Sequence, residues 1–374
     1  MERRLQELTQ LGVSVWLDDL DRRRLTSGNL AELIAEWCVR GVTTNPSIFE
    51  AALRKAPEAY ADQLHQCAAD QLDVEQAIRE LTTDDVRAAC DLLLPLWQSS
   101  DGVDGRVSIE VDPRLAHDST ATVAQARQIW EQVGRANAMI KIPATRAGLA
   151  AISEVIGLGI SVNVTLIFSP QRYGEVAAAY ERGLAAARMA GIDLGSIHSV
   201  ASVFVSRVDT LVDAWLDQLG TATAQELRGR AGVTNAQLVW GSYLRHLASE
   251  EWAALSAAGA HPQRPLWAST GVKDPALPDT WYITELIGPG CVNTMPEATM
   301  RAFADHGHIS RAGLSDPRTL DAAQDVWQHL DALGLDAVVM AQTLEDNGVA
   351  AFVTAWEQLL DAARAVMEGA NARS

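Results

Sequence analysis

The segment AMIKIPATRAGLAAISEVIGLGISVNVTL, residues 138–166, begins and ends with a short run of apolar and β-branched residues. Such runs, at 138–142 and 160–166, are typical of strands, and the longer segment between them is typical of a crossover connection. The same pattern predicts six further strands, at residues 13–17, 42–44, 106–111, 197–203, 265–268 and 291–294. Apolar residues at three-to-four spacing predict helices between strands, for example at 29–40, 121–134, 171–190 and 207–218.

Eight strands joined by helical connections predict an α/β protein with a closed (β/α)8 TIM barrel, while a doubly wound open sheet would give a similar pattern. Two additions to the barrel are expected. Residues 51–98 should form two or three helices inserted after the second strand, and residues 316–368 a helical cap at the C-terminus. Because no Pro-, Gly- or Ser-rich linker interrupts the chain, we expect residues 1–374 to form a single barrel domain.

The composition argues against several classes of protein. A formal net charge of −18 opposes binding to nucleic acid or to an anionic membrane surface. Neither a signal-peptide core nor an apolar run long enough to span a bilayer is found, so a cytoplasmic protein is expected. No GxGxxG or GxxxxGK[ST] motif follows a strand, which disfavours dinucleotide and P-loop folds. The four cysteines have no CxxC spacing and are expected to be reduced thiols: Cys38, Cys67, Cys90 and Cys291.

Polar residues alternate with aliphatic ones inside several strands, which is unusual for strands that are buried on both faces. If the aliphatic faces pack against the helices, five polar residues point into the barrel: Glu110, Lys141, Asn163, Thr165 and Ser202. Burying such groups without partners is costly, so the interior must hold a solvated or ligand-filled cavity. Barrel active sites lie at the C-terminal ends of the strands, where Asp18, Thr43, Thr44 and Asn45 also fall.

Lys141 points to the chemistry of this cavity. Only three of the 30 basic residues are lysines, namely Lys55, Lys141 and Lys273. A lysine amine can lose its proton and become neutral, whereas an arginine guanidinium stays charged. A buried amine loses hydration, which favours its neutral form, and a neutral amine can attack a ketone or aldehyde to form an iminium. The alternative is a structural ion pair between Lys141 and Glu110.

A metal site is the competing use of the carboxylates near the third strand. Its ligands would be Glu110, Asp112, His117 and Asp118. Asp112 shares a face with Glu110 only if the strand continues through Pro113, so we expect no metal.

Eight segments, in order between about residues 11 and 299, resemble the transaldolase family. They are WLDDLDR (16–22), GVTTNPSIF (41–49), VSIEVDPRL (107–115), MIKIPAT (139–145), NVTLIFS (163–169), SVFVSR (202–207), WASTGVKDP (267–275) and VNTMPEAT (292–299). TTNPS, IEVDPRL and IKIPAT are specific in combination. The insert and the helical tail are similar to those of the long-chain, actinobacterial-type branch of the family.

The resemblance implies a role for each candidate residue. Lys141 would form the Schiff base, and Asp18 would move the proton of the hydroxyl next to the cleaved bond. Glu110 and Thr165 would position a water for carbinolamine dehydration. The expected substrate-binding residues are Asn45, Asn163 and Ser202 for the dihydroxyacetone unit, Phe204 and Ser269 in the pocket, and Arg207 with Lys273 for the phosphate.

The resemblance also implies the reaction, which is transfer of dihydroxyacetone from sedoheptulose 7-phosphate to glyceraldehyde 3-phosphate. Erythrose 4-phosphate and fructose 6-phosphate would be the products, in the non-oxidative pentose phosphate pathway. No cofactor is expected, because the enamine on the lysine stores the electron pair. Two alternatives stay open: a class I aldolase acting on fructose 6-phosphate, and a non-catalytic sugar-phosphate-binding barrel. The oligomeric state, monomer or homodimer, is also left open.

Overall fold

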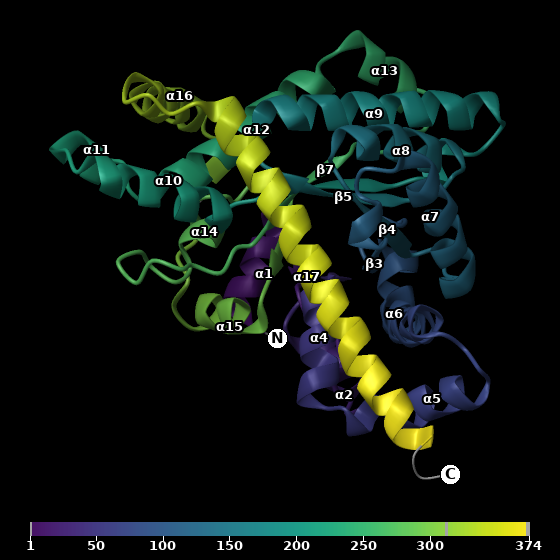
Figure 1. Ribbon diagram of the computed structural model, residues 1–374. Coiled ribbons are helices and arrows are strands. Elements are labelled where there is room, and N and C mark those ends of the chain that lie inside the picture. The colour runs from purple at the N-terminus through teal and green to yellow at the C-terminus, as the bar shows by residue number, and fades with distance from the viewer. Residues whose placement is uncertain (1, 311–312, 372–374) are drawn as a thin grey trace.

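The computed structural model describes residues 2–310 and 313–371, and in this part of the chain eight parallel strands close into a barrel (Figure 1). The strands are β1 (Ser14–Leu17), β2 (Gly41–Thr43), β3 (Arg106–Glu110), β4 (Ala138–Pro143), β5 (Val162–Ile167), β6 (Ser199–Phe204), β7 (Arg264–Ala268) and β8 (Val292–Met295). Pairing of β1 with β8 closes the ring, which excludes the open sheet. All eight predicted strands are therefore confirmed, with ends that differ by no more than two residues.

Helices alternate with these strands and cover the outside of the ring. They are α1 (Arg3–Gln10), α2 (Arg22–Thr26), α3 (Asn29–Glu36), α7 (Ser119–Val133), α8 (Arg146–Gly157), α9 (Pro170–Met189), α10 (Ser206–Leu219), α11 (Ala222–Glu226), α12 (Ala231–Leu247), α13 (Glu250–Ser256), α14 (Trp281–Thr284) and α15 (Glu297–His306). The connection from β4 to α8 shows how one of these helices begins directly after a strand. The Thr145 hydroxyl accepts a hydrogen bond from the Gly148 N–H at 2.9 Å and so caps the helix.

Three helices are inserted between β2 and β3: α4 (Pro46–Lys55), α5 (Glu58–Ala69) and α6 (Val74–Ser99). The insertion predicted at 51–98 is therefore helical, but it begins five residues earlier than expected. The reason is local, because the Asn45 side chain accepts a hydrogen bond from the Ile48 N–H at 3.1 Å, and Pro46 has the backbone angle that a first helical turn needs.

The C-terminal helices are α16 (Pro317–Ala332) and α17 (Ala337–Asn371), which confirms the helical cap predicted at 316–368 and shows that it is two helices joined by residues 333–336. Helix α17 lies across the molecule in Figure 1, and it contacts α4, α5, α6, α10 and β5. These contacts place it over the C-terminal ends of the strands. No helix in residues 2–310 and 313–371 combines the length and the hydrophobicity needed to cross a bilayer.

One predicted side-chain direction is wrong. The alternation along β5 puts Leu166 on the outward face with Val162 and Val164, but Leu166 has a φ of 59° and the β5–β6 register shifts between Val164 and Ile167. Leu166 consequently packs with Phe168 and with residues of α17. A side chain added at Gly348 in α17 would come within 2.9 Å of Leu166, so glycine allows the close approach of the helix.

The interior of the barrel has an apolar layer on the N-terminal side of the polar residues that point into it. Its members are the buried side chains of Trp16, Met139, Val200, Leu266 and Val292. Trp16 is fully buried, and Gly41 on the neighbouring strand leaves room for its ring. A Cβ atom at position 41 would lie 2.5 Å from the Trp16 ring, closer than atoms can pack.

We expect Gly41→Ala to lower the free energy of unfolding by roughly 1–3 kcal/mol, because the Trp16 ring must shift inside a packed layer. The matched control is Gly174→Ala in α9, where nothing lies within 4 Å of an added Cβ. That change should raise the free energy of unfolding by up to about 1 kcal/mol through helix propensity. Urea denaturation followed by circular dichroism measures both. A Gly41→Ala protein as stable as the unmodified one would show that Trp16 is not confined.

Candidate active site

A cavity of about 160 Å³ opens at the C-terminal ends of the strands. Its lining comes from the ends of β1, β2, β4, β6, β7 and β8, from the starts of α4 and α10, and from α17. Seven of the eleven predicted site residues line it: Asp18, Asn45, Lys141, Ser202, Phe204, Arg207 and Ser269. The other lining residues are Thr43, Ser47, Ala268, Thr294 and Phe352.

Lys141 is buried in the middle of this group, with 5% of its side chain exposed. Its Nζ donates a hydrogen bond to the backbone carbonyl of Thr44 at 3.0 Å. The Glu110 Oε2 atom lies 3.6 Å from Nζ, because Glu110 and Lys141 are paired neighbours on β3 and β4. Glu110 Oε2 has no hydrogen-bond partner within the described residues, so the contact is a loose ion pair and not a tightly bonded one.

Both carboxyl groups near Lys141 are harder to ionise than exposed ones. Burial raises the pKa of Glu110 to about 7, and the charge of Lys141 opposes this rise. Burial also raises the pKa of Asp18, against the charge of Lys141 and a 2.6 Å hydrogen bond from the Thr43 hydroxyl. A carboxyl group with a pKa of about 7 can both accept and donate a proton near neutral pH.

Asn163, on β5, lies inside the barrel and forms hydrogen bonds with side chains of β3 and β6. Its Nδ2 donates to the Ser108 hydroxyl at 2.9 Å, and its Oδ1 accepts from the Ser202 hydroxyl at 2.7 Å. The Thr165 hydroxyl is buried and has no partner among the described residues. Buried polar groups normally have partners, so Thr165 and Glu110 offer hydrogen bonds to a water or a ligand.

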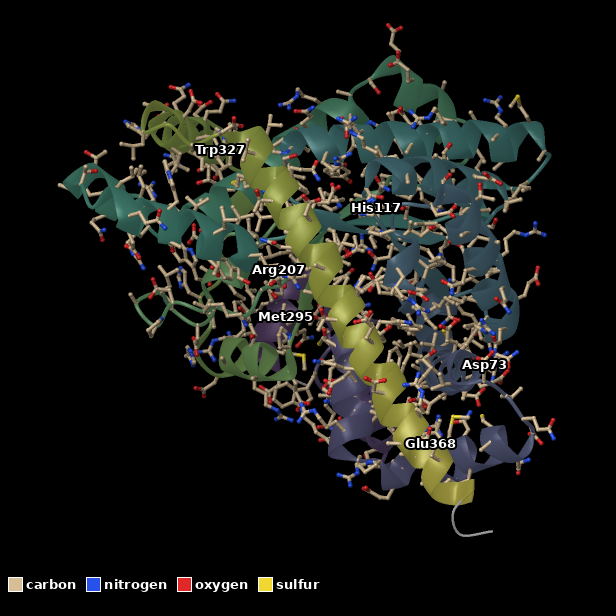
Figure 2. All side chains as sticks on the ribbon, in the orientation of Figure 1. Asp73, His117, Arg207, Met295, Trp327 and Glu368 are labelled. Carbon is tan, nitrogen blue, oxygen red and sulfur yellow. The ribbon has the colours of Figure 1, made fainter. Side chains whose placement is uncertain are left out.

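Arg207 is the cation at the mouth of the cavity, at the start of α10. Its guanidinium lies between two aromatic rings, 5.1 Å from the centre of Phe204 and 5.6 Å from that of Phe352. Figure 2 shows Arg207 beside the middle of α17. Burial lowers the pKa of Arg207, and the charges of Glu110 and Asp18 oppose this shift.

The turn after β7 supports the same region. Ser269 has a φ of 57°, a left-handed conformation that is uncommon for serine. Its hydroxyl shares a 2.7 Å hydrogen bond with the Ser206 hydroxyl, the residue before Arg207. This bond ties the start of α10 to the end of β7 and so helps to hold Arg207 at the mouth.

Lys273 lies outside the cavity and is the one exposed residue among the eleven predicted site residues. It is in the loop after β7 and does not line the cavity.

The acidic residues considered as metal ligands have other partners, because Asp112 holds the Arg114 guanidinium and Asp118 caps α7 through the Ala121 N–H. In residues 2–310 and 313–371, no group of three or more possible ligand side chains gathers to hold a metal.

Four lining residues were not predicted from the sequence, namely Ser47, Ala268, Thr294 and Phe352. Phe352 is the least expected of them. It comes from α17, and its ring centre lies 5.8 Å from Lys141 Nζ. In the sequence it is one apolar residue in a helical pattern, with no polar neighbour or motif to set it apart. Only the path of α17 across the barrel brings it over the lysine.

Comparison with known proteins gives one consistent family. The family model described as Transaldolase/Fructose-6-phosphate aldolase matches residues 15–363. The protein named Transaldolase 1 from Streptomyces avermitilis is 55% identical over 372 residues, covering 98% of this chain and 97% of the relative. A Mycolicibacterium smegmatis protein named Transaldolase is 55% identical, with 98% of both chains covered, and one from Thermobifida fusca is 54% identical, with 96% of both covered.

These matches confirm the resemblance seen in the sequence motifs. They extend over nearly the whole chain, including the insertion and most of α17, and the relatives are of closely similar length. The fold and the buried lysine in the barrel agree with them. The chain therefore belongs to the transaldolase/fructose-6-phosphate aldolase family.

Proposed function

We propose that the protein transfers a dihydroxyacetone unit from sedoheptulose 7-phosphate to glyceraldehyde 3-phosphate, giving erythrose 4-phosphate and fructose 6-phosphate. The reaction belongs to the non-oxidative pentose phosphate pathway, and we place it in the cytoplasm, acting as one domain of residues 1–374. The observation that carries the proposal is the buried amine of Lys141, 3.6 Å from the Glu110 carboxyl, in the same cavity as the Arg207 guanidinium.

In the first step, the Lys141 amine adds to the ketone carbon of the donor and forms a C–N bond. The amine must be neutral to do so, and the neighbouring Glu110 is a suitable acceptor for its proton because the pKa of Glu110 is raised to about 7. Loss of water from the resulting carbinolamine needs a proton on the departing oxygen. Glu110 returns that proton through a water that the unpartnered Thr165 hydroxyl helps to position.

In the second step, the C3–C4 bond of the iminium breaks. Asp18 takes the proton of the C4 hydroxyl, the electron pair of the C3–C4 bond moves into the iminium to form an enamine, and an aldose phosphate leaves. Because burial raises the pKa of Asp18, its carboxylate is a stronger base than an exposed aspartate. The acceptor aldehyde then adds to the enamine by the same steps in reverse, so no metal or cofactor has to store the electrons.

The remaining predicted residues hold the substrate. Asn45, Asn163 and Ser202 offer amide and hydroxyl groups to the hydroxyls of the dihydroxyacetone unit. Arg207 offers a planar guanidinium to the phosphate, with Phe204 and Ser269 beside it and Lys273 as a second cation. Phe352 covers the lysine from the side of α17, which would keep bulk water from the enamine.

We expect Lys141→Arg to reduce transfer at least about a thousandfold, because a guanidinium stays protonated and cannot add to a carbonyl. Borohydride reduction of the unmodified enzyme with fructose 6-phosphate should add mass to the peptide that contains residue 141, and the variant should gain none. Lys55→Arg, at an exposed lysine, is the matched control and should retain both signals. A mass gain at position 141 would be absent if the protein were a non-catalytic sugar-phosphate-binding barrel.

A second measurement separates transfer from release. With fructose 6-phosphate and an aldose phosphate acceptor, we expect transfer product to form much faster than free dihydroxyacetone, because the enamine in a covered cavity waits for the acceptor. Without the acceptor, little dihydroxyacetone should appear. Comparable release with and without acceptor would instead identify a class I aldolase.

We expect Arg207→Ala to raise the Michaelis constant for phosphorylated substrates roughly tenfold or more, because a charge-assisted contact to the phosphate is lost. Arg188→Ala, at an exposed arginine outside the cavity, is the control and should leave the constant unchanged. Lys273→Ala measures the contribution of the second cation. An unchanged constant in Arg207→Ala would remove Arg207 from the phosphate site.

A further inference from the structure

A second and larger cavity, of about 530 Å³, lies at the opposite end of the barrel. It is lined by the N-terminal ends of β1, β3, β6 and β7 and by the loops before them. The polar residues that matter for its chemistry are Arg40, Asp104, Arg106, His198, His261 and Arg264. None of them belongs to the active site described above.

This cavity is positively charged, although the chain carries a net charge of −18. Three arginines line it, and the only carboxylate in its lining is that of Asp104. Asp104 is shared between Arg40, at 3.5 Å, and Arg264, at 3.4 Å. One carboxylate cannot neutralise three guanidinium groups, so an excess of positive charge is left at the cavity.

Arg106 is the central group. It is the first residue of β3 and is 1% exposed. Its Nε donates to the Gly102 carbonyl at 2.6 Å and its Nη1 to the Ser161 hydroxyl at 3.3 Å, but its Nη2 has no partner within the described residues. No carboxylate of residues 2–310 and 313–371 forms an ion pair with Arg106. A buried guanidinium without a counter-charge is costly, and a bound anion would remove that cost.

Two further side-chain nitrogens lie near Arg106 Nη2 beside Gly102, one from His198 in the cavity lining and one from Trp97 next to it. A side chain added at Gly102 would come within 3.0 Å of His198 Nε2, 3.2 Å of Arg106 Nη2 and 3.3 Å of Trp97 Nε1. Trp97 Nε1 is itself buried without a partner among the described residues, and so is the Nε atom of Arg40. His198 stacks on His261 with ring centres 4.1 Å apart.

The electrostatics of these groups agree with the geometry. Burial lowers the pKa of Arg106 to about 9, and the like charge of Arg264 adds to this shift. Burial and then the charge of Arg106 also lower the pKa of His198 far below its ordinary range. His198 is therefore neutral at physiological pH, and adding an anion would relieve the repulsion between the two arginines.

We propose that this cavity binds a small phosphate-bearing anion, either inorganic phosphate or a phosphate ester. The fork of a guanidinium group matches the oxygens of a phosphate, and the volume of the cavity leaves room for the remainder of a small ester. The site is distinct from the proposed substrate site, because Arg106 and Glu110 are the first and last residues of β3. The two sites lie at opposite ends of the barrel, with the apolar layer around Trp16 and Met139 in its interior.

The test measures inorganic phosphate binding by isothermal titration calorimetry in an Arg207→Ala background, which weakens the active-site phosphate contact. One phosphate site should remain in this protein. Adding Arg40→Gln should weaken binding roughly tenfold, and adding Arg106→Gln should weaken it at least as much, because each removes a charged donor. Adding Arg188→Gln, which makes the same charge change at an exposed position, should leave binding unchanged.

Three results would overturn the proposal. They are loss of all phosphate binding in Arg207→Ala alone, unchanged binding in Arg40→Gln and Arg106→Gln, and equal binding of chloride at the same concentration. If Arg106→Gln does not fold, as judged by circular dichroism, the result for Arg40→Gln decides, since 31% of that side chain is exposed and the change is mild. Repeating the titration with glucose 6-phosphate separates the sources, because tighter binding than inorganic phosphate identifies an ester as the ligand.

Discussion

The active site is built around a lysine, Lys141, that is buried beside the carboxyl group of Glu110. A lysine with 5% of its side chain exposed needs polar neighbours, and it has the Thr44 carbonyl at 3.0 Å and the Glu110 carboxyl at 3.6 Å. The same low-dielectric surroundings raise the pKa of Glu110 to about 7. The environment that makes the lysine costly to bury therefore also supplies a proton acceptor next to it.

The C-terminal helix α17 completes this environment from outside the barrel. Its glycine at position 348 lets the helix backbone approach Leu166, and one turn further Phe352 lies over both Lys141 and Arg207. The unusual backbone of Leu166 at the end of β5 turns that side chain toward the helix. A helical tail that could be read as an appendage is thus part of the wall of the cavity.

Charged and polar side chains point into the barrel near both of its ends, and an apolar layer lies between them. On β3 the inward residues are Arg106 at one end and Glu110 at the other. In the lower interior, Trp16 and Met139 contribute to an apolar layer. The two side chains therefore lie at opposite ends of one strand, where Arg106 lines the second cavity and Glu110 lies 3.6 Å from Lys141.

The amino-acid sequence alone predicts the eight strands, the family, and the polar row that contains Glu110, Lys141 and Asn163, because the period of two along a strand and the family motifs are local properties. Three features follow from the folding of the whole chain: the direction of Leu166, the place of Phe352, and the cluster around Arg106. The first depends on a register shift between two strands, and the other two depend on contacts between residues far apart in the chain. No local spacing encodes such contacts, since they arise from how α17 crosses the barrel and from how its closure gathers the strand ends.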